Sequence, residues 1–503
     1  MGTENSEDTE NPQDTGNQED TDSPEQSLGT KATRGFLWAN LGIFTRYGAA
    51  LVLASLLARS LNESQYGAMA IMTIVLLYFD TALDLGMGAA LVYEQETGIT
   101  KRVKVAFSAN VMLGLVMGIA AFLMAPLITG FFDFPEFTAE FRAIGLVIFI
   151  SAFTTVPWAL FLREMEFKNR AFTEVARDLT RFGVTLALIL LGFGLWGVVL
   201  GFMAAKIVWL CGTWWFLRFK PQWAWDRTIV GELFAYAWRM AGTRFLGLLA
   251  LNGDYFVVGA RASGEVGVYY QAFRLPEFVM AGQLNAMSAV LFPMYARVRS
   301  EGDAALRAAM FKALRVVGLF SIPVGIGLAL VARDAFSVMF GHQDPAGIAT
   351  MQVISLTGCV VGLGFATGDL LFATGRPDIM FKLNAVMVPL MLGSMWIVAP
   401  NGIVWIAVVH LVTAAIFTTV RQLIVNQIIG TTMKGVLLSI IPGLTIGLFV
   451  ALFAVPVRLV TPGGFGSLCA IAVAGAAGAA IGFAISRPAR VEILDLVAKL
   501  RGR

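Results

Sequence analysis

Charged residues, cysteine and histidine are all scarce in this chain. Asp, Glu, Lys and Arg make up 14% of the 503 residues, whereas a soluble domain carries about a quarter. The three cysteines, Cys211, Cys359 and Cys469, fall within apolar stretches without metal-ligand spacing, which argues against a metal site and a disulfide framework. Of the two histidines, His342 is expected in a loop and His410 inside an apolar stretch, where hydrogen-bonded packing and a proton relay both remain open. We therefore expect no metal, no cofactor and no nucleic-acid partner.

Hydrophobic residues are abundant instead, at 57% of the chain. A helix needs about 20 mostly apolar residues to cross a bilayer. About fourteen such stretches can be placed, which predicts an all-α polytopic membrane protein; they begin near residues 35, 67, 105, 142, 171, 195, 232, 267, 315, 348, 383, 402, 435 and 464. The longest connector, from Arg297 to Lys312, leaves no room for a soluble catalytic domain, so an enzyme is not expected.

Basic residues outside the apolar stretches divide unequally between the two sides of the membrane. If both termini are cytoplasmic, 25 Lys and Arg residues fall in inside segments, Arg421 among them, and 5 fall in outside loops. Segments rich in Lys and Arg stay on the cytoplasmic side. Both termini are therefore expected in the cytoplasm.

Composition and span number divide the chain into five parts. Residues 1–32 are acidic and polar, and are expected to form a disordered cytoplasmic tail. A lobe of six spans is expected over residues 33–230 (the N-lobe), and a second lobe of six spans over residues 231–430 (the C-lobe). Spans 13 and 14 follow over residues 431–486, and residues 487–503 are expected to form a cytoplasmic amphipathic tail.

Seven cations fall inside apolar stretches, although each costs about 2.5–3.5 kcal/mol at the centre of a bilayer. None is expected within the last six stretches, where Asp369 is the only buried acid expected. A water-filled cavity that holds an anion is the simplest explanation for these cations, which are Arg46, Arg177, Arg181, Lys206, Arg239, Arg244 and Arg274.

The chain also repeats weakly after six spans. Each copy has a buried Arg, then a turn with a Gly, then a buried acid in the following span: Arg46, Gly67 and Asp80 in the first copy, and Arg244, Gly267 and Glu277 in the second. Parallel repeats of this kind are typical of transporters, whose substrate site lies between the two halves.

Four of the seven cations come from spans 1, 7 and 8, where the repeat predicts that the two lobes meet. Guanidinium groups bind phosphate oxygens through paired hydrogen bonds, so the candidate ligands of a pyrophosphate are Arg46, Arg239, Arg244 and Arg274. Asp254 and Glu277 are candidates for holding these side chains while the site is empty. A structural role, in which each Arg pairs with an acid and locks the lobes together, remains open.

Two further groups of charges accompany these arginines. Asp80 and Asp84 lie one turn apart, where they could bind a coupling cation or pair with an arginine as a gate. Asp80, Asp84, Asp254 and Glu277 are thus the gating or coupling candidates. In the fifth span four charges share one helix face and predict either an internal ladder of ion pairs or a charged cavity wall: Glu174, Arg177, Asp178 and Arg181.

Four segments of the chain carry a family resemblance: LARSLNESQYGAMAIMTIVLLYFDTALDLGMGAALV, NGDYFVVGARASGEVGVYYQAFRLPE, LLFATGRPDIMFKLNAV and GFGLWGVVLG. They resemble the polysaccharide transporter family, the Wzx-type flippases of the MOP superfamily. The resemblance implies a V-shaped, MATE-like bundle of two lobes with alternating access. It also implies that the cavity receives an undecaprenyl-pyrophosphate-linked oligosaccharide, which moves from the inner to the outer leaflet of the bacterial inner membrane. By the same resemblance, spans 13 and 14 could form a lipid groove.

The leading hypothesis is therefore a lipid-linked oligosaccharide flippase that serves the synthesis of exopolysaccharide, capsule or O-antigen. Its expected partners are the oligosaccharide, membrane lipid, the polysaccharide polymerase machinery, and H⁺ or Na⁺ as the coupling ion. A cation-coupled, MATE-like exporter of drugs or metabolites is the alternative. It predicts an acidic and aromatic cavity, and the excess of buried arginine argues against it.

Overall fold

The computed structural model describes residues 48–491, with the exceptions of 49, 85–98 and 165. All regular elements in this part of the chain are helices, and the two expected tails lie wholly or mostly outside it. One group of helices, called here the first group, comprises a helix over Ala50–Ser60, α2 (Glu63–Asp84), α4 (Ile99–Phe131), α5 (Thr138–Arg163), α6 (Phe167–Leu190) and α7 (Leu195–Phe216).

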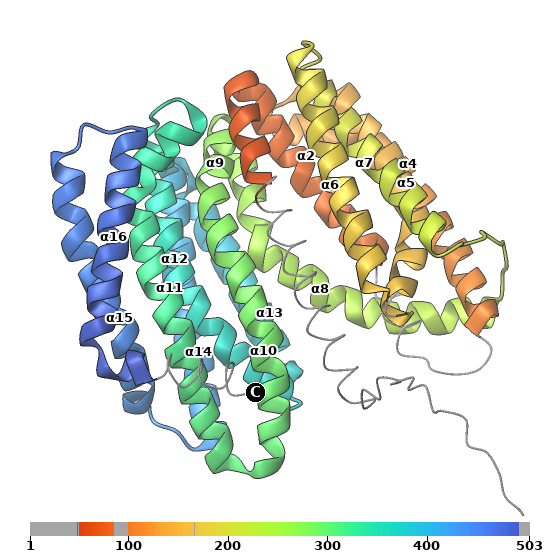
Figure 1. Ribbon diagram of the computed structural model, residues 1–503. Coiled ribbons are helices and arrows are strands. Elements are labelled where there is room, and N and C mark those ends of the chain that lie inside the picture. Colours follow the sequence, from red (N-terminus) through yellow and green to blue (C-terminus); the bar gives the residue numbers. More distant parts are fainter. Residues whose placement is uncertain (1–47, 49, 85–98, 165, 492–503) are drawn as a thin grey trace, which may run out of the picture.

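A long helix, α8 (Arg227–Arg261), connects the first group to a second one. The second group comprises α9 (Val266–Pro276), α10 (Gly282–Val298), α11 (Asp303–Phe340), α12 (Pro345–Ala373), α13 (Pro377–Val398), α14 (Ile403–Ile429), α15 (Met433–Val460) and α16 (Phe465–Ile485). Figure 1 shows that the two groups come close near α2 and α9 and diverge toward the opposite end, where α8 runs between them.

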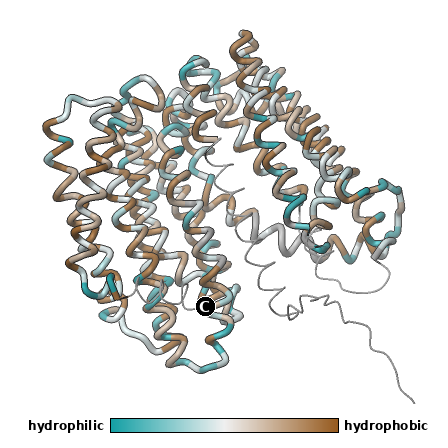
Figure 2. Tube along the Cα trace, in the orientation of Figure 1, coloured by the Kyte–Doolittle hydropathy of each residue, from teal (hydrophilic) through white to brown (hydrophobic). Residues whose placement is uncertain are grey.

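These segments are helical because they are apolar. In a bilayer each backbone polar group must be bonded within its own segment, and a helix satisfies this requirement. Ten of the described helices are long and apolar enough to cross a membrane. Helices α6 and α8 have the length but carry more charge. Hydrophobic residues run along the helices, and hydrophilic ones gather at helix ends and connections (Figure 2). The total of fourteen spans stays a prediction, since some of the expected spans lie outside the described residues.

Small residues let neighbouring helices approach closely within each group. A Cβ atom added at Gly118 of α4 would lie 2.6 Å from the carbonyl oxygen of Gly145 in α5. A Cβ atom at Gly443 of α15 would lie 2.4 Å from the carbonyl oxygen of Gly318 in α11, and one at Gly478 of α16 would lie 2.4 Å from that of Phe449. Glycine at these positions therefore serves close backbone packing, as is usual between membrane helices.

The two turns of the sequence repeat meet where the helix groups come closest. A Cβ atom added at Gly267, in the first turn of α9, would lie 3.4 Å from the backbone nitrogen of Gly67 in α2. Beside them, the buried rings of Tyr66 and Tyr270 make an edge contact with centroids 6.0 Å apart. The repeat thus marks the contact between α2 and α9.

The predicted connector from Arg297 to Lys312 is helical over most of its length. Helix α10 continues to Val298, and α11 begins at Asp303, directly after Gly302 with its φ of 100°. The segment after Asp303 is rich in Ala, Leu and Met, which favour helix even where the chain is no longer apolar. Helix α11 therefore extends beyond the apolar stretch that hydropathy marks.

Candidate functional site

A cavity of about 270 Å³ lies where α2, α6 and α7 of the first group face α9 of the second. Its apolar wall comes from the helix over Ala50–Ser60 and from parts of α2 and α7. Four cations and two carboxylates line it, namely Arg177, Arg181, Lys206 and Arg274 with Asp80 and Asp178. This central cavity therefore carries an excess of positive charge at its wall.

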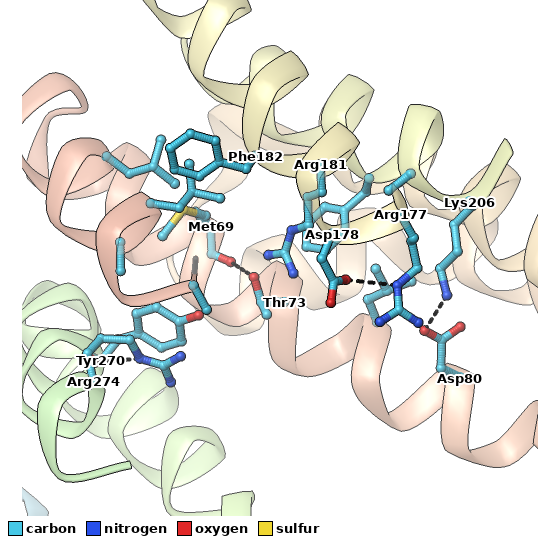
Figure 3. A pocket seen from close by; sticks show the side chains of 17 residues that line it. Met69, Thr73, Asp80, Arg177, Asp178, Arg181, Phe182, Lys206, Tyr270 and Arg274 are labelled. Atoms are coloured by element: carbon cyan, nitrogen blue, oxygen red, sulfur yellow. Dashed lines mark hydrogen bonds and ion pairs between the residues drawn. The ribbon is translucent and has the colours of Figure 1, made fainter. Parts of the chain in front are cut away.

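At one side of the central cavity, Lys206 of α7 pairs with Asp80 of α2 (Figure 3). The Lys206 Nζ atom lies 2.6 Å from Asp80 Oδ2. The ammonium group also lies 4.9 Å from the ring centroid of Trp209, one turn along α7. Lys206, for which the sequence suggests no partner, is thus held by Asp80.

The charged face of α6 forms part of the cavity wall. The ladder of i, i+3 ion pairs is wrong, because Arg177 Nε lies 2.8 Å from Oδ1 of the adjacent Asp178. Glu174 instead faces Arg170, at 3.8 Å. Arg177 also lies over Trp209 of α7, with its guanidinium carbon 5.1 Å from the ring centroid.

Arg181 has a different environment from the other cations of α6. Its guanidinium lies 4.0 Å from the ring centroid of Phe202 in α7. No carboxylate in the described part of the chain lies within ion-pair distance of it, and Figure 3 shows the group directed into the cavity. Because a guanidinium has five N–H donors, Arg181 can still bind an anion.

On the opposite side of the cavity, Arg274 of α9 lies over the ring of Tyr270, at 3.9 Å from its centroid (Figure 3). Arg274 Nη2 also lies 2.9 Å from Glu277 Oε2. Glu277 therefore holds Arg274 in this structure. Sequence reasoning missed Tyr270, although its position one turn before Arg274 on α9 is a signal that could have found it.

Three of the four expected substrate ligands cannot be placed in this cavity from the structure. Arg46 lies outside the described residues, and the side chains of Arg239 and Arg244, both on α8, lie outside them as well. Their role stays a prediction. Asp84 ends α2 one turn beyond Asp80, and it does not line the central cavity.

Asp254 does not hold an arginine among the described residues. Its carboxylate is 1% exposed and accepts a hydrogen bond from the Tyr269 hydroxyl at 2.8 Å. The Nδ1 atom of His410 lies 3.8 Å from the same oxygen. Asp254 thus belongs to a separate cluster formed by α8, α9 and α14.

A second cavity, of about 260 Å³, lies between α8, α12, α13 and α14. Its lining includes Arg421, which the sequence assigns to a cytoplasmic segment after the twelfth apolar stretch and which lies within α14. Arg421 lies inside α14, and a Cβ atom at Gly364 of α12 would lie 2.0 Å from its Nη2. The apolar residues that follow Arg421 in the sequence could have shown that the helix continues. The expectation that Asp369 is the only buried acid in the last six spans is wrong, because Asp334 of α11 is 3% exposed.

The fold is that of MOP-superfamily transporters. A MATE-family multidrug resistance transporter of this superfamily, in its inward-facing conformation, superposes with a TM-score of 0.62 at 16% identity, over 77% of this chain and 96% of that one. The lipid II flippase MurJ, in an inward closed conformation, superposes with a TM-score of 0.71 at 13% identity, over 89% of this chain and 98% of that one. The expected fold class, an all-α bundle related to MATE proteins, is confirmed.

Curated relatives agree on one biological setting. The lipopolysaccharide biosynthesis protein WzxC of Escherichia coli (strain K12) is 25% identical, over 71% of this chain and 73% of its own length. The succinoglycan biosynthesis transport protein ExoT of Rhizobium meliloti (strain 1021) is 24% identical, over 76% and 78%. The chain matches the family described as "Polysaccharide biosynthesis protein" over residues 56–344, and it belongs to that family.

Proposed function

We propose that this protein is a flippase that moves a lipid-linked oligosaccharide from the inner to the outer leaflet of the bacterial inner membrane. The observation that carries the proposal is the cationic central cavity, enclosed by apolar helices of a transporter fold. Its relatives serve lipopolysaccharide and succinoglycan biosynthesis, and MurJ is a lipid II flippase. The protein is accordingly a transporter and not an enzyme.

The proposed anionic group is the pyrophosphate that joins the oligosaccharide to its undecaprenyl carrier. Arg181 offers a guanidinium without an acidic partner among the described residues, and Arg274 faces it from α9. Arginine suits this task because its planar donors match phosphate oxygens in pairs. Arg46, Arg239 and Arg244 remain proposed ligands of the same pyrophosphate. The prenyl chain would stay in the surrounding lipid.

Alternating access is the proposed mechanism, with an N-lobe over residues 33–230 and a C-lobe over residues 231–430 that rock about the α2–α9 contact. Residues 431–486 would cover the C-lobe on its far side. The excess of basic residues in alternate connections supports cytoplasmic termini, whether or not Arg421 is counted. Coupling to H⁺ or Na⁺, and delivery of the product to a polysaccharide polymerase, are parts of the same proposal.

A cation-coupled exporter is less well supported, although a MATE-family transporter has the same fold. A cavity for organic cations would be expected to carry negative charge, whereas four cations and two carboxylates line this one. The charge of the central cavity therefore favours an anionic substrate.

The test is a deletion of this protein in its own bacterium. Lipid-linked oligosaccharide should accumulate on the cytoplasmic leaflet, and expression of the unaltered protein should restore its outward movement. Leaflet distribution is measured by the access of an impermeant periodate probe to the sugar in oriented membrane vesicles. An unchanged distribution in the deletion strain would exclude the flippase, and sensitivity to cationic drugs instead would support the exporter.

A further inference from the structure

A buried acid and a histidine face each other away from the central cavity. Asp254 of α8 is 1% exposed, and its Oδ1 accepts a hydrogen bond from the backbone N–H of Tyr255 at 3.0 Å. Its Oδ2 accepts the Tyr269 hydroxyl at 2.8 Å and lies 3.8 Å from His410 Nδ1. No Lys or Arg in the described part of the chain lies within ion-pair distance of this carboxylate. His410 is therefore the group that can balance its charge.

The histidine has access to the second cavity. His410 lies on the face of α14 that lines this cavity, and the face continues one, two and three turns along through Ala414, Phe417, Thr418 and Arg421. Within the described residues its Nδ1 atom has no hydrogen-bond partner. Water in the second cavity can thus exchange a proton with His410, which lies against the buried Asp254 carboxylate.

Charge balance makes the pair sensitive to a single proton. A buried carboxylate without a counter-charge is costly. With one proton between them the pair is neutral overall, either as an ion pair or as a neutral acid beside a neutral imidazole. Loss of that proton leaves one uncompensated negative charge between α8, α9 and α14. Proton occupancy therefore changes the stability of this helix contact.

The other titratable groups near the pair do not respond at the same pH. Tyr255 on α8, Tyr269 on α9 and Tyr78 on α2 face Asp254, and a phenol ordinarily titrates near pH 10. Arg274 and Glu277 lie farther off, beyond Tyr255, as an ion pair of their own. From α13 the apolar side chain of Leu392 packs on Gly253. Asp254 and His410 are the groups that can change charge near neutrality.

Helix α9 connects this pair to the central cavity. On one face of α9, Tyr269 binds Asp254, and the Phe273 ring lies 6.3 Å from the His410 ring. On the other face, Tyr270 and Arg274 line the central cavity. The helix is short, and a π-helical turn over Glu277–Ala281 follows it. Such turns are frequent at functional sites, and a movement of α9 here would reach both cavities.

We propose that Asp254 and His410 form a proton-binding site open to the second cavity, and that its occupancy positions α9 and hence Arg274 in the central cavity. The bound proton comes from water in the second cavity and returns to water when the pair opens. The link to transport rests on the proposed function, whereas the proton site itself does not. The contacts of the central cavity alone do not indicate this proton-binding role of Asp254 and His410.

The proton site can be tested without any substrate. The chain has two histidines, so the full-length protein labelled with ¹⁵N-histidine in lipid nanodiscs gives two imidazole titrations by NMR. We expect His410 to change its protonation state within the pH range in which the protein stays folded, and Asp254→Asn to lower its midpoint by about one pH unit or more. His342, whose ring packs on Phe336, is the internal control in both proteins. A His410 that does not titrate, or has the same midpoint in both proteins, would overturn the site.

A second variant keeps the test decisive if Asp254→Asn does not fold. Tyr269→Phe removes one hydroxyl that stabilises the carboxylate and leaves Asp254 in place. Protonated His410 then becomes the main group that stabilises the Asp254 carboxylate. The titration midpoint of His410 should therefore move to higher pH. An unchanged midpoint in Tyr269→Phe would contradict the proposed cluster.

Coupling is tested in oriented vesicles by outward movement of lipid-linked oligosaccharide with and without an imposed proton gradient. The unaltered protein should respond to the gradient, and His410→Gln should lose at least nine-tenths of that response while its abundance stays normal. A full response in His410→Gln would overturn coupling at this site. If no oligosaccharide moves even with the unaltered protein, the flippase fails, and the NMR titration still decides whether the proton site exists.

Discussion

The Nζ atom of Lys206 lies 2.6 Å from Asp80 Oδ2 and thereby joins α7 to α2 at the wall of the central cavity. Lys206 is buried, whereas Asp80 is about one third exposed to the cavity. The two residues are separated by 126 positions in the sequence. Trp209 packs on the same ammonium group and on Arg177, so three elements of the wall depend on this pair.

Removal of one partner of this pair should destabilise the protein. Lys206→Ala leaves Asp80 without its counter-charge, and breaking a buried ion pair in this way costs about 3 kcal/mol or more. We expect a lower midpoint of thermal unfolding for the purified protein in detergent and a lower abundance in the membrane. The double variant Asp80→Asn with Lys206→Met should recover most of the loss, because no uncompensated charge remains.

The same variants separate a structural lock from a gate. If Lys206→Ala unfolds at the same temperature as the unaltered protein but blocks export, the pair controls access to the cavity and does not hold the fold together. A double variant as unstable as Lys206→Ala would show that packing, rather than charge, is lost.

Arg181 should be needed for export but not for folding. Its replacement by Ala removes a charge-assisted hydrogen-bond donor set from the cavity, and such bonds contribute about 1.5–3 kcal/mol each. We expect export to fall about 10- to 100-fold, with normal membrane abundance. Arg142→Ala is the matched control, because Arg142 is exposed on α5 and packs on Phe122 outside the cavity. Equal export in the two variants would remove Arg181 from the site.

The α2–α9 contact should not tolerate a larger residue. Gly267→Val places a branched side chain where even a Cβ atom would lie 3.3 Å from the Tyr66 ring and 3.4 Å from the Gly67 nitrogen. Overpacking of this kind costs about 1–3 kcal/mol, and export should fall as α9 moves away from α2. Gly264→Ala is the control, since nothing lies within 4 Å of a Cβ atom there. If Gly267→Val changes neither export nor the unfolding temperature, the contact can accommodate a larger side chain.

The start of α8 should respond to acid, but not near neutral pH. The hydrogen bond from Lys101 Nζ, at 2.6 Å, and those from the Thr228 and Ile229 amides hold the pKa of Asp226 below its usual value. A lowered pKa stabilises the fold above the usual pKa of Asp, and that stability is lost as the pH falls through the lowered value. Amide exchange of Thr228 and Ile229 should therefore stay constant from pH 8 to 5 after correction for intrinsic rates, and accelerate only below about pH 4.

Two variants separate the cap from the ion pair at this position. Asp226→Asn keeps a side-chain acceptor for the helix amides but loses the charge opposite Lys101, while Asp226→Ala loses both. Exchange should be fastest in Asp226→Ala and intermediate in Asp226→Asn. Indistinguishable rates in the two variants would mean that the cap contributes nothing measurable.

The sequence gives a sound prediction of those features that depend on local composition. Low charge and long apolar stretches predict an all-helical membrane bundle, because the cost of polar groups in lipid leaves few alternatives. The same cost makes buried cations conspicuous, so Arg177, Arg181, Lys206 and Arg274 could be singled out without coordinates. Gly67 and Gly267 could be aligned from the repeat, and they lie at the contact between the two helix groups.

Tertiary structure decided which of these charges meet and which remain available. Asp80 meets Lys206, Asp254 meets His410, and Arg421 lies within α14, where hydropathy predicts the end of a span. Helical spacing restricts partners on one helix, but it says nothing about which face of a distant helix packs opposite. That choice depends on how glycines and large side chains pack across the whole bundle. The residues that form the cavity wall could therefore be identified only from the assembled helices.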